Sequence, residues 1–478
     1  MKHSPTMPKK GSSEANELTY GKSAPDMVVE SDSQVSVTEI RKQVVDLAAP
    51  ALTEMVLVSF VGVADMIMVG RLGPPAIAAV GLSNQPIFFA IGIFQALNVG
   101  TTALVARFVG AGMKKDANAT AKQSLIVTIL LGALVGVLGY LITPWVMVAM
   151  GAEADVLPLG ITYMQIVCLG IPFQTVGMVC SSVLRGAGDT RIPMVVNLTA
   201  NFVNVLGNYL LIYGHWGFPR LEIAGAAIAT SLSSVVACIF FLVIMTTGRS
   251  LIHIPLTGKY RPNWEILRSV FSVGFPAAIE QFVFRGGQLT YVRIVSSFGT
   301  SVFAAHQIGM NILSLSFMPG QAFSIAATTL VGQGLGAAQP NLAERSALET
   351  RRLGMIISTV IAATMFFFGR FIAALYTDDP EVIQRTAMVL KIIGVVQPAQ
   401  STQFILSGGL RGAGDTRWPL YSTILGIWGV RVVVGYFLAV QLGLGLLGAW
   451  MGMALDQCTR ALVISHRFNR GGWKKIAI

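Results

Sequence analysis

Residues 184–191 read Leu-Arg-Gly-Ala-Gly-Asp-Thr-Arg, and residues 410–417 read the same eight residues, 226 positions later. Identical residues continue at this offset on both sides of the octapeptide. The clearest pairs are Pro50 and Pro276, Glu54 and Glu280, Gly73 and Gly299, Gln95 and Gln321, Thr102 and Thr328, Gly110 and Gly336, Pro172 and Pro398, and Pro193 and Pro419. Identical octapeptides in one register are very improbable by chance, so the chain contains two copies of one module.

The composition is that of an integral membrane protein. Hydrophobic residues make up 53% of the 478 residues and charged residues only 12%, whereas about 25% of a soluble domain is charged. Apolar stretches near the length of a bilayer span recur along the chain. The four cysteines lie in apolar segments without paired spacing, so we interpret them as packing residues and expect neither a disulfide nor a metal site from them.

The pattern predicts an all-α integral membrane protein with twelve transmembrane helices in two pseudo-symmetric six-helix bundles. The expected helices cover residues 43–70, 76–106, 119–143, 155–184, 191–213, 223–247, 264–294, 301–333, 345–375, 382–410, 417–441 and 446–468. Several exceed the roughly 20 residues that cross a bilayer, so tilted helices are expected. Because each copy holds six helices, both copies enter the membrane from the same side, as parallel repeats.

Two polar tails and one polar linker complete the expected organisation. Residues 1–40 are rich in Ser, Lys and Glu without an apolar period, which predicts a disordered tail. The first bundle is expected over residues 41–247 and the second over 264–470. Residues 248–263 form the linker between them, and residues 471–478 form a C-terminal tail. The linker and both tails are expected on the cytoplasmic side.

The Lys and Arg residues set the expected orientation. Most of them fall in the two termini and in the loops after the second, fourth, sixth, eighth and tenth helices, whereas acids such as Glu153 and Asp379 fall in the opposite loops. The positive-inside rule then predicts a multi-pass protein of the plasma (inner) membrane with both termini in the cytoplasm. The net charge of +11 is mainly a topology signal, so it does not indicate a nucleic-acid partner.

The octapeptide is expected to form the tight cytoplasmic elbow between the fourth and fifth helices of each copy. Arg185 would face the negative end of a helix, Gly186 and Gly188 would permit a positive φ, and Asp189 or Thr190 would cap the next helix. The equivalent elbow residues of the second copy are Arg411, Gly412, Gly414 and Asp415. A phosphate-binding loop is disfavoured because no Lys-Ser/Thr follows the glycines.

These features resemble the multidrug and toxic compound extrusion (MATE) family of the MOP flippase superfamily. The resemblance covers residues 41–470. It rests on the twelve spans, the sequence Val-Ala-Asp-Met-Ile-Met-Val-Gly at 63–70, the two Arg-Gly-x-Gly-Asp elbows, and Asn-x-x-x-Asn at 204–208. It implies a V-shaped transporter that works by alternating access and exports cationic, amphipathic compounds in exchange for H⁺ or Na⁺. It also implies that the acid of the first helix, here Asp65, is the coupling residue.

Asp65 is also the strongest candidate on physical grounds, because an ionisable side chain inside a span is costly and usually functional. Asn204 and Asn208 are four residues apart and share one face of a helix, and Thr230 is expected at a similar depth. Together these groups would form a proton or cation site, with Na⁺ at Asp65 as the candidate metal. Some relatives carry Asp in place of Asn208. The alternative is that the asparagines only bridge helices.

Other intramembrane polar residues are candidates for a substrate cavity or a proton relay. Asn201 extends the asparagine face, either towards a water-filled cavity or in helix–helix bonding. Glu54 and Glu280 are expected near mid-membrane, where they would relay protons, meet a cationic substrate, or bond at the bundle interface. The remaining candidates share one face of the helix at 264–294: Gln281, Arg285 and Gln288.

The two copies differ at these positions. Tyr291 stands where the first copy has Asp65, and the asparagine pair has no counterpart in the second copy. Coupling is therefore expected in the first bundle. Arg431 lies in a predicted span, where a buried arginine must pair, and Glu280 is one possible partner. An arginine that faces the cavity would hinder a cationic substrate, so anionic or zwitterionic substrates stay open.

Two classes of transporter fit the sequence. The leading hypothesis is a secondary active multidrug efflux antiporter, and the alternative is a flippase for a lipid-linked precursor, which would need several arginines in its cavity. An enzyme is disfavoured because the five histidines are scattered and no Ser/His/Asp grouping or nucleotide loop occurs. We expect a monomer in the lipid bilayer that acts on small amphipathic molecules and needs no cofactor besides the coupling cation.

Overall fold

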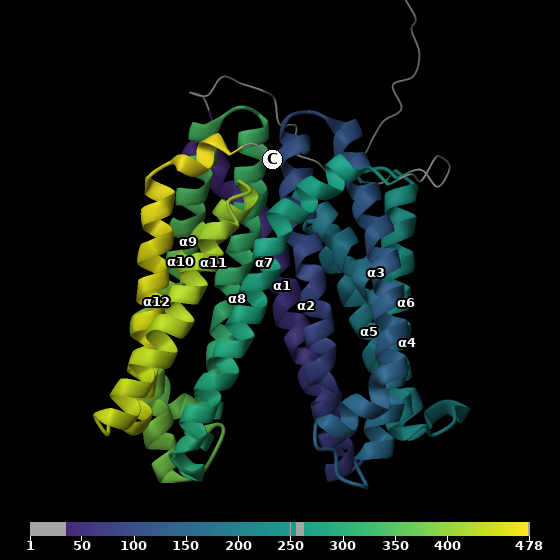
Figure 1. Ribbon diagram of the computed structural model, residues 1–478, viewed down its shortest axis with the longest axis vertical. Helices are drawn as coiled ribbons and strands as arrows, with labels where there is room; N and C mark the ends of the chain where they lie inside the picture. The colour runs from purple at the N-terminus through teal and green to yellow at the C-terminus, as the bar shows by residue number, and fades with distance from the viewer. Residues whose placement is uncertain (1–34, 249, 255–261, 477–478) are drawn as a thin grey trace, which may run out of the picture.

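The structure, a computed structural model, describes residues 35–248, 250–254 and 262–476 (Figure 1). Every regular element within these ranges is helical, as the composition predicts. The expected disordered tail as far as residue 34 and the linker residues 255–261 lie outside the described residues.

The predicted twelve helices are confirmed, with small differences in their ends. The first bundle contains α1 (Val37–Gly70), α2 (Pro74–Gly110), α3 (Lys114–Ala149), α4 (Leu157–Gly186), α5 (Arg191–Tyr213), the turn η1 (His215–Gly217) and α6 (Glu222–Thr246). The second contains α7 (Trp264–Ser296), α8 (Thr300–Gly336), α9 (Pro340–Ala374), α10 (Pro380–Gly412), α11 (Arg417–Thr423), η2 (Ile424–Val434), η3 (Phe437–Gln441), α12 (Gly445–Asn469) and the turn η4 (Gly472–Lys475). The eleventh span is thus α11 followed by two π-helical segments, η2 and η3.

The expected disordered N-terminal tail is wrong at its inner end. α1 begins at Val37 rather than after residue 40, because the Ser36 hydroxyl caps it by accepting from the Glu39 backbone N–H at 3.1 Å and Ile40 is buried. At the C-terminus, Trp473 is fully buried and stacks on Phe468 with ring centroids 4.8 Å apart. This segment is therefore packed onto α12.

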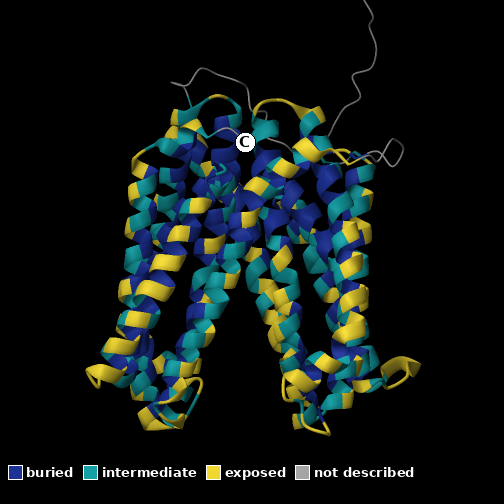
Figure 2. Cartoon of the chain, viewed as in Figure 1, coloured by how far each residue is buried: buried dark blue, intermediate teal, exposed yellow. Residues whose placement is uncertain are grey.

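The two bundles form a V (Figure 1). They meet at the end that carries the C-terminus, here called the closed end, and they separate towards the opposite, open end. At the closed end α1 packs on α8 and α9, and α2 packs on α7 and α8. Ile40, Val44 and Leu47 of α1 join Phe323 and Leu330 of α8 in one apolar cluster. Buried residues are concentrated towards this end in Figure 2.

Nine spans in the described ranges are long and apolar enough to cross a membrane. The helices that fall short of this criterion are α8, α10 and α12. α10 lies against α8, α9 and α12, and it buries Gln397, Gln400 and Gln403, so its polar side chains face protein instead of lipid. These are the properties of a multi-pass membrane protein.

A buried ion pair ties the octapeptide of each copy to the first helix of its own bundle. Arg185 Nη2 donates to the two carboxylate oxygens of Glu54 at 2.8 and 2.9 Å, and Arg411 Nη2 donates to those of Glu280 at 2.9 and 2.8 Å. Glu54 is 6% exposed and Glu280 is 7% exposed. The arginine that begins the elbow therefore holds α1 against α4, and α7 against α10.

A neutral side chain from the next helix completes each pair. Asn197 Nδ2 of α5 donates to Glu54 at 2.7 Å, and Thr423 Oγ1 of α11 donates to Glu280 at 3.1 Å. All three positions in one bundle match those in the other at the offset of the octapeptide repeat. The repeated sequence thus places the same three-helix junction in both bundles.

The elbow glycines have two different roles. Gly188 and Gly414 have positive φ values of 94° and 84°, as expected of a helix stop. Gly186 and Gly412 were expected to share this conformation but do not. They instead permit close packing, because a Cβ on them would lie 2.7 Å from the Thr102 carbonyl oxygen and 2.1 Å from that of Thr328.

The elbow acids also differ between the copies. Asp189 Oδ1 accepts from the backbone N–H groups of Arg191 and Ile192, both at 3.0 Å, which is the expected cap. Asp415 instead accepts from Arg467 Nε at 2.7 Å. The equivalent acid therefore anchors α12 to the elbow of the second bundle.

Two further glycines let α2 and α8 cross at the closed end. A Cβ on Gly110 would lie 2.0 Å from the Gln333 carbonyl oxygen, and a Cβ on Gly336 would lie 2.0 Å from that of Arg107. Each contact is the equivalent of the other under the repeat. The two backbones can touch at this crossing because neither helix carries a side chain at its glycine.

We predict that Gly110→Ala and Gly336→Ala each destabilise the protein, by about 1–3 kcal/mol, because the added methyl group forces the crossing apart. The measurement is the thermal unfolding midpoint in detergent. Gly62→Ala is the matched control, because a Cβ there meets nothing within 4 Å. Unchanged midpoints for both closed-end variants would contradict the prediction.

We predict that Arg185→Met costs about 3–5 kcal/mol of stability, because it leaves the Glu54 carboxylate buried without a cation. The double variant with Glu54→Gln should recover part of this loss, since no charge is then left unpaired. A double-mutant cycle from unfolding midpoints measures the coupling between the two residues. Purely additive effects would show that the ion pair does not hold the bundle together.

Candidate functional site

The four residues predicted to form a cation site come together inside the first bundle. Asp65 lies one to two turns before the end of α1, on the side of the open end, and faces Asn204 and Asn208 of α5. Asn208 Nδ2 donates to Asp65 Oδ1 at 2.7 Å. With the Asn204 amide turned so that its oxygen accepts from Thr230 Oγ1 at 3.3 Å, its nitrogen donates to both Asp65 oxygens at 3.0 Å. Thr230 of α6 thus closes the group.

The charge of Asp65 is not balanced by the protein. No Lys, Arg or His in the described ranges lies within 4.0 Å of its carboxylate, although Asn204 and Asn208 are at most 5% exposed. The site offers one carboxylate, two amides and a hydroxyl, which are oxygen ligands suited to a hard cation. Nowhere in the described part of the chain do three His, Cys, Asp or Glu side chains gather as for a transition metal.

The rest of the asparagine face divides between two environments. Asn197 belongs to the buried ion pair of Glu54 and Arg185. Asn201 is half-buried between that pair and the Asp65 group. Asn201, the cavity residue predicted on α5, therefore lies between the Glu54–Arg185 ion pair and Asp65.

Glu54 and Glu280 do not stand alone in mid-membrane. Each is held by an elbow arginine, so Glu280, which the sequence offered as one possible partner of Arg431, pairs with Arg411 instead. The sequence could not show this, because Arg411 was interpreted only as a helix-terminal cation. With both oxygens of each carboxylate occupied, the interpretation of these glutamates as bundle junctions is favoured over a proton relay.

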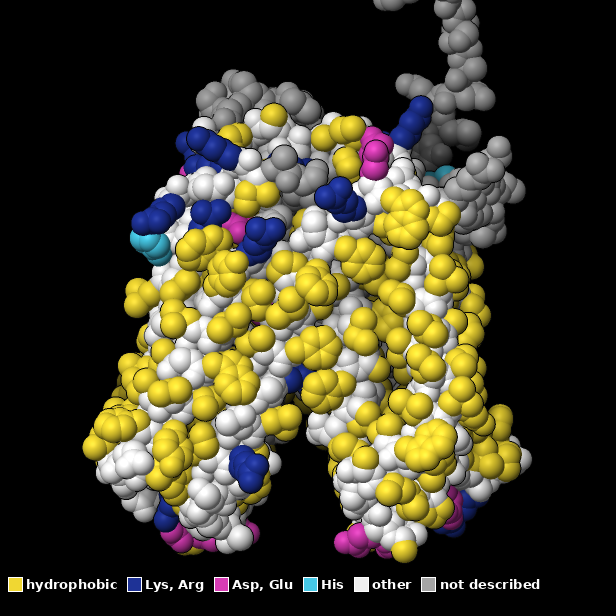
Figure 3. Space-filling model, viewed as in Figure 1, with side chains coloured by type: hydrophobic (Ala, Val, Ile, Leu, Met, Phe, Trp, Pro, Cys, Tyr) yellow, Lys and Arg dark blue, Asp and Glu magenta, His cyan; other side chains and the backbone are white. Residues whose placement is uncertain are grey.

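The candidates on α7 face two different ways. Arg285 is half-buried and lies over the Phe88 ring of α2, 5.6 Å from its centroid. Phe282, one turn earlier, stacks on Phe89 of α2 at 6.3 Å. These contacts join the two bundles, and Figure 3 shows the cleft between the bundles with mainly hydrophobic side chains on its visible walls. Gln281 is half-buried on the same helix.

Gln288, by contrast, is bonded to the interior of the second bundle. Its Oε1 accepts from Arg431 Nη1 at 3.0 Å. Arg431 is 1% exposed and donates from Nε to Asp456 Oδ2 at 2.8 Å. Arg460 Nε lies 2.9 Å from Asp456 Oδ1. This group of Arg431, Asp456 and Arg460 is fully buried.

Sequence reasoning missed Asp456 and Arg460. Neither residue was predicted to pair with Arg431. Two signals were present: an acid in the middle of an apolar helix, and an Asp-x-x-x-Arg spacing that places both charges on one face.

A family model described as MatE matches this chain twice, over residues 50–210 and 276–437. The two matches begin at Pro50 and Pro276, which are equivalent positions of the internal repeat.

Curated relatives match over most of the chain. It is 35% identical over 447 residues to the probable multidrug resistance protein NorM of Thermotoga maritima, covering 92% of this chain and 95% of that protein. It is 27% identical over 428 residues to the uncharacterized transporter YisQ of Bacillus subtilis, covering 89% and 94%.

A solved structure of another protein has the same fold as this chain. It is described as the outward-facing conformation of a multidrug resistance MATE family transporter of the MOP superfamily. Its TM-score is 0.85 at 25% identity, over 92% of this chain and 97% of that one. The two family matches and the NorM relative establish that this chain belongs to the MATE family of multidrug transporters.

Proposed function

We propose that the protein is a secondary active antiporter that exports amphipathic organic compounds in exchange for a cation bound at Asp65. The observation that carries the proposal is the Asp65 carboxylate, which accepts from Asn204 and Asn208 and has no cationic partner in the described ranges, while Thr230 bonds to Asn204. The coupling cation is H⁺ or Na⁺, and it binds in the first bundle.

The proposed coupling follows from the charge of the site. A carboxylate inside a membrane protein must be neutralised before its surroundings close around it. A proton does this directly. Na⁺ requires oxygen ligands, so the amides of Asn204 and Asn208, which now direct nitrogen atoms at Asp65, would have to rotate. Both routes make closure of the first bundle depend on an incoming cation.

The proposed direction of transport rests on the V and on the charges at its ends. Figure 3 shows Lys and Arg side chains near the closed end and acidic side chains at the tips of the open end. By the positive-inside rule, we propose that the closed end and both termini lie on the cytoplasmic side of the plasma membrane. The cleft faces outwards, as in the outward-facing relative, and Asp65 is near the outer side.

The apolar cleft supports an amphipathic substrate, and we propose organic cations as the main class. The flippase alternative needs several arginines in the cavity. Arg431 cannot serve, because it is 1% exposed and paired with Asp456. Arg285 and Arg293 of α7 are the arginines that remain as candidates, so the burial of Arg431 weakens the flippase alternative.

We predict that Asp65→Asn folds normally but loses efflux driven by a cation gradient, because the nearly isosteric amide carries no charge to neutralise. The measurement is ethidium efflux from proteoliposomes under a pH gradient and, separately, under a sodium gradient. The gradient that drives the wild type names the coupling ion. Asp155→Asn, the same change at an exposed loop position, should keep wild-type efflux. Full gradient-driven efflux by Asp65→Asn would exclude Asp65 as the coupling residue.

We predict that Asn208→Ala keeps transport but changes by about tenfold the concentration of coupling cation needed for half-maximal efflux, because it removes a hydrogen bond to a charged group worth about 1.5–3 kcal/mol. If H⁺ is the coupling ion, less of it is needed, because the lost bond stabilised the ionised carboxylate. If Na⁺ is the coupling ion, more of it is needed, because an amide oxygen ligand is lost. The measurement is efflux rate against the concentration of the coupling ion. Asn201→Ala is the control on the same helix. An equal shift in both variants would show that the Asp65 contact is not responsible.

A further inference from the structure

Two hydrogen bonds cross the closed end, from α8 of the second bundle to the elbow of the first. Thr329 Oγ1 donates to the Arg185 backbone carbonyl at 2.8 Å, and Gln333 Nε2 donates to the Gly186 backbone carbonyl at 3.2 Å. Thr329 is fully buried and Gln333 is 6% exposed. Both acceptors are backbone atoms of the repeated octapeptide, so the elbow of the first bundle also binds the second bundle.

The two carbonyls depend on these bonds to different degrees. An α-helix leaves its last carbonyls without partners of its own, and both carbonyls lie at the end of α4. The Arg185 carbonyl also accepts from the Gly188 N–H at 3.1 Å. The Gly186 carbonyl accepts from Gln333, and no backbone N–H within the described ranges bonds to it. Separation of the bundles therefore requires water to replace Gln333.

The elbow of the second bundle lacks the equivalent bonds. Under the repeat, Ala103 and Arg107 of α2 stand at the positions of Thr329 and Gln333. The Ala103 side chain carries no donor. The buried Nη1 atom of Arg107 has no hydrogen-bond partner in the part of the chain that the structure describes. Side-chain bonds between α2 or α8 and an elbow of the other bundle are thus made at the first elbow and not at the second.

A further polar contact at the closed end is exposed to water. Arg41 Nε of α1 lies 2.9 Å from Glu349 Oε2 of α9. The Arg41 side chain is 42% exposed, and exposed ion pairs contribute little to stability. Hydrogen bonds that are shielded from water cost more to break. The contacts of Thr329 and Gln333 are therefore the polar contacts at this end that most oppose separation of the bundles.

We propose that Thr329 and Gln333 form a lock that holds the closed end shut and sets how often it opens. The lock meets the first helix at Arg185, because the side chain of this residue holds Glu54 of α1 while its carbonyl accepts from Thr329. The proposal rests on the proposed function in one respect: export requires the closed end to open during the cycle. Opening breaks both bonds, so their strength determines the population of the open form.

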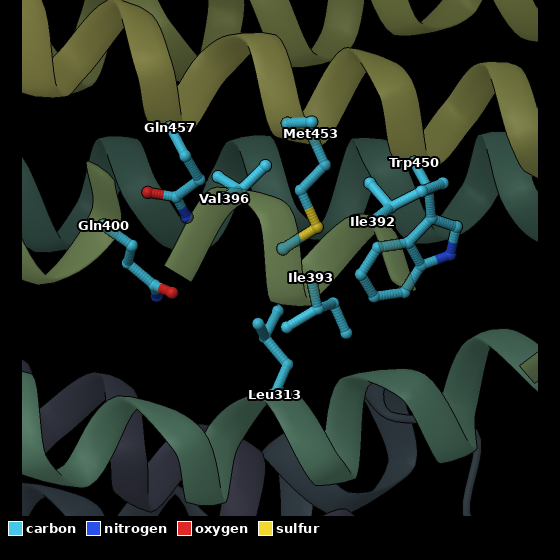
Figure 4. A pocket seen from close by; sticks show the side chains of 9 residues that line it. Leu313, Ile392, Ile393, Val396, Gln400, Trp450, Met453 and Gln457 are labelled. Carbon is cyan, nitrogen blue, oxygen red and sulfur yellow. The ribbon is translucent and has the colours of Figure 1, made fainter. Parts of the chain in front are cut away.

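Loosening inside a bundle has to be distinguished from opening between the bundles. Figure 4 shows a small cavity inside the second bundle, between α8, α10 and α12, with Leu313, Val396 and Met453 among its lining residues. Gln397, the neighbour of Val396, donates from Nε2 to the Ser316 carbonyl at 2.7 Å. This bond joins α10 to α8 within one bundle. Gln397→Met therefore removes a buried glutamine bond without touching the lock.

The test measures how fast a thiol at the closed end reacts. Val44 of α1 is fully buried, in an apolar cluster with residues of α8 and α10 such as Phe323 and Ile405, so a thiol introduced by Val44→Cys is reached when the bundles separate. A water-soluble maleimide is added to the purified full-length protein in detergent, and each cysteine is followed by mass spectrometry. The rate at this position follows the population of the open form. Native Cys180, buried inside the first bundle, reports unfolding of that bundle.

Thr329→Val and Gln333→Met should each speed modification of the added cysteine by about tenfold, the effect of losing one buried hydrogen bond. Thr328→Val is the matched control, because the neighbouring hydroxyl bonds within its own bundle, to the carbonyls of Ser324 at 2.8 Å and Gly408 at 2.9 Å. It should leave the rate unchanged, as should Gln397→Met. Two lock variants keep the test valid if one of them does not fold.

Three results would overturn the proposal. They are a wild-type rate in the lock variants, an equal rise in the control variants, and an equal rise at Cys180, which would indicate unfolding instead of opening. No substrate and no ion gradient is present, so the result does not depend on whether Asp65 binds the coupling cation. Failure of the lock and failure of the proposed antiport are therefore separate outcomes.

Discussion

Each bundle of this transporter depends on a buried glutamate–arginine ion pair between its first helix and its elbow. Glu54 with Arg185, and Glu280 with Arg411, fix the first helix of each bundle against the fourth. A buried charge without its partner costs several kcal/mol of stability, so loss of either residue of a pair destabilises its bundle. Because the elbow glycines allow tight packing beside the pair, the octapeptide is at once a turn, an ion-pair donor and a packing surface. These three roles explain why both copies of the module contain the octapeptide.

On this shared frame the two bundles carry opposite excess charges. The first has Asp65 without a cationic partner, and the second has Arg431 and Arg460 around one Asp456. The repeat fixes where these groups lie, and the differences between the copies fix their charge. In the proposed function, a cation that enters the first bundle removes a charge that the protein does not balance by itself. The closing of the first bundle would then depend on the ion gradient, whereas that of the second bundle would not.

Much of this arrangement could be predicted from the sequence. Apolar length predicts the helices, the octapeptide predicts the repeat, and helical spacing predicts that Asn204, Asn208 and Asp65 meet. The failures concern contacts between distant segments. The partner of Glu280 is Arg411 in the last turn of α10, 131 positions away, and no periodicity reveals such a pair. The π-helical segments η2 and η3 were not foreseen either, because their wider turns leave no mark in apolar spacing. The early start of α1 depends on burial against the second bundle.

We propose that the unpaired carboxylate of Asp65 binds the coupling cation. The most direct measurement is the charge displaced in proteoliposomes on a solid-supported membrane after a rapid jump in H⁺ or Na⁺ concentration, without substrate. The account predicts a transient current in the wild type for one of the two ions and none in Asp65→Asn. A current of equal size in both proteins would show that the cation binds elsewhere and would contradict the account.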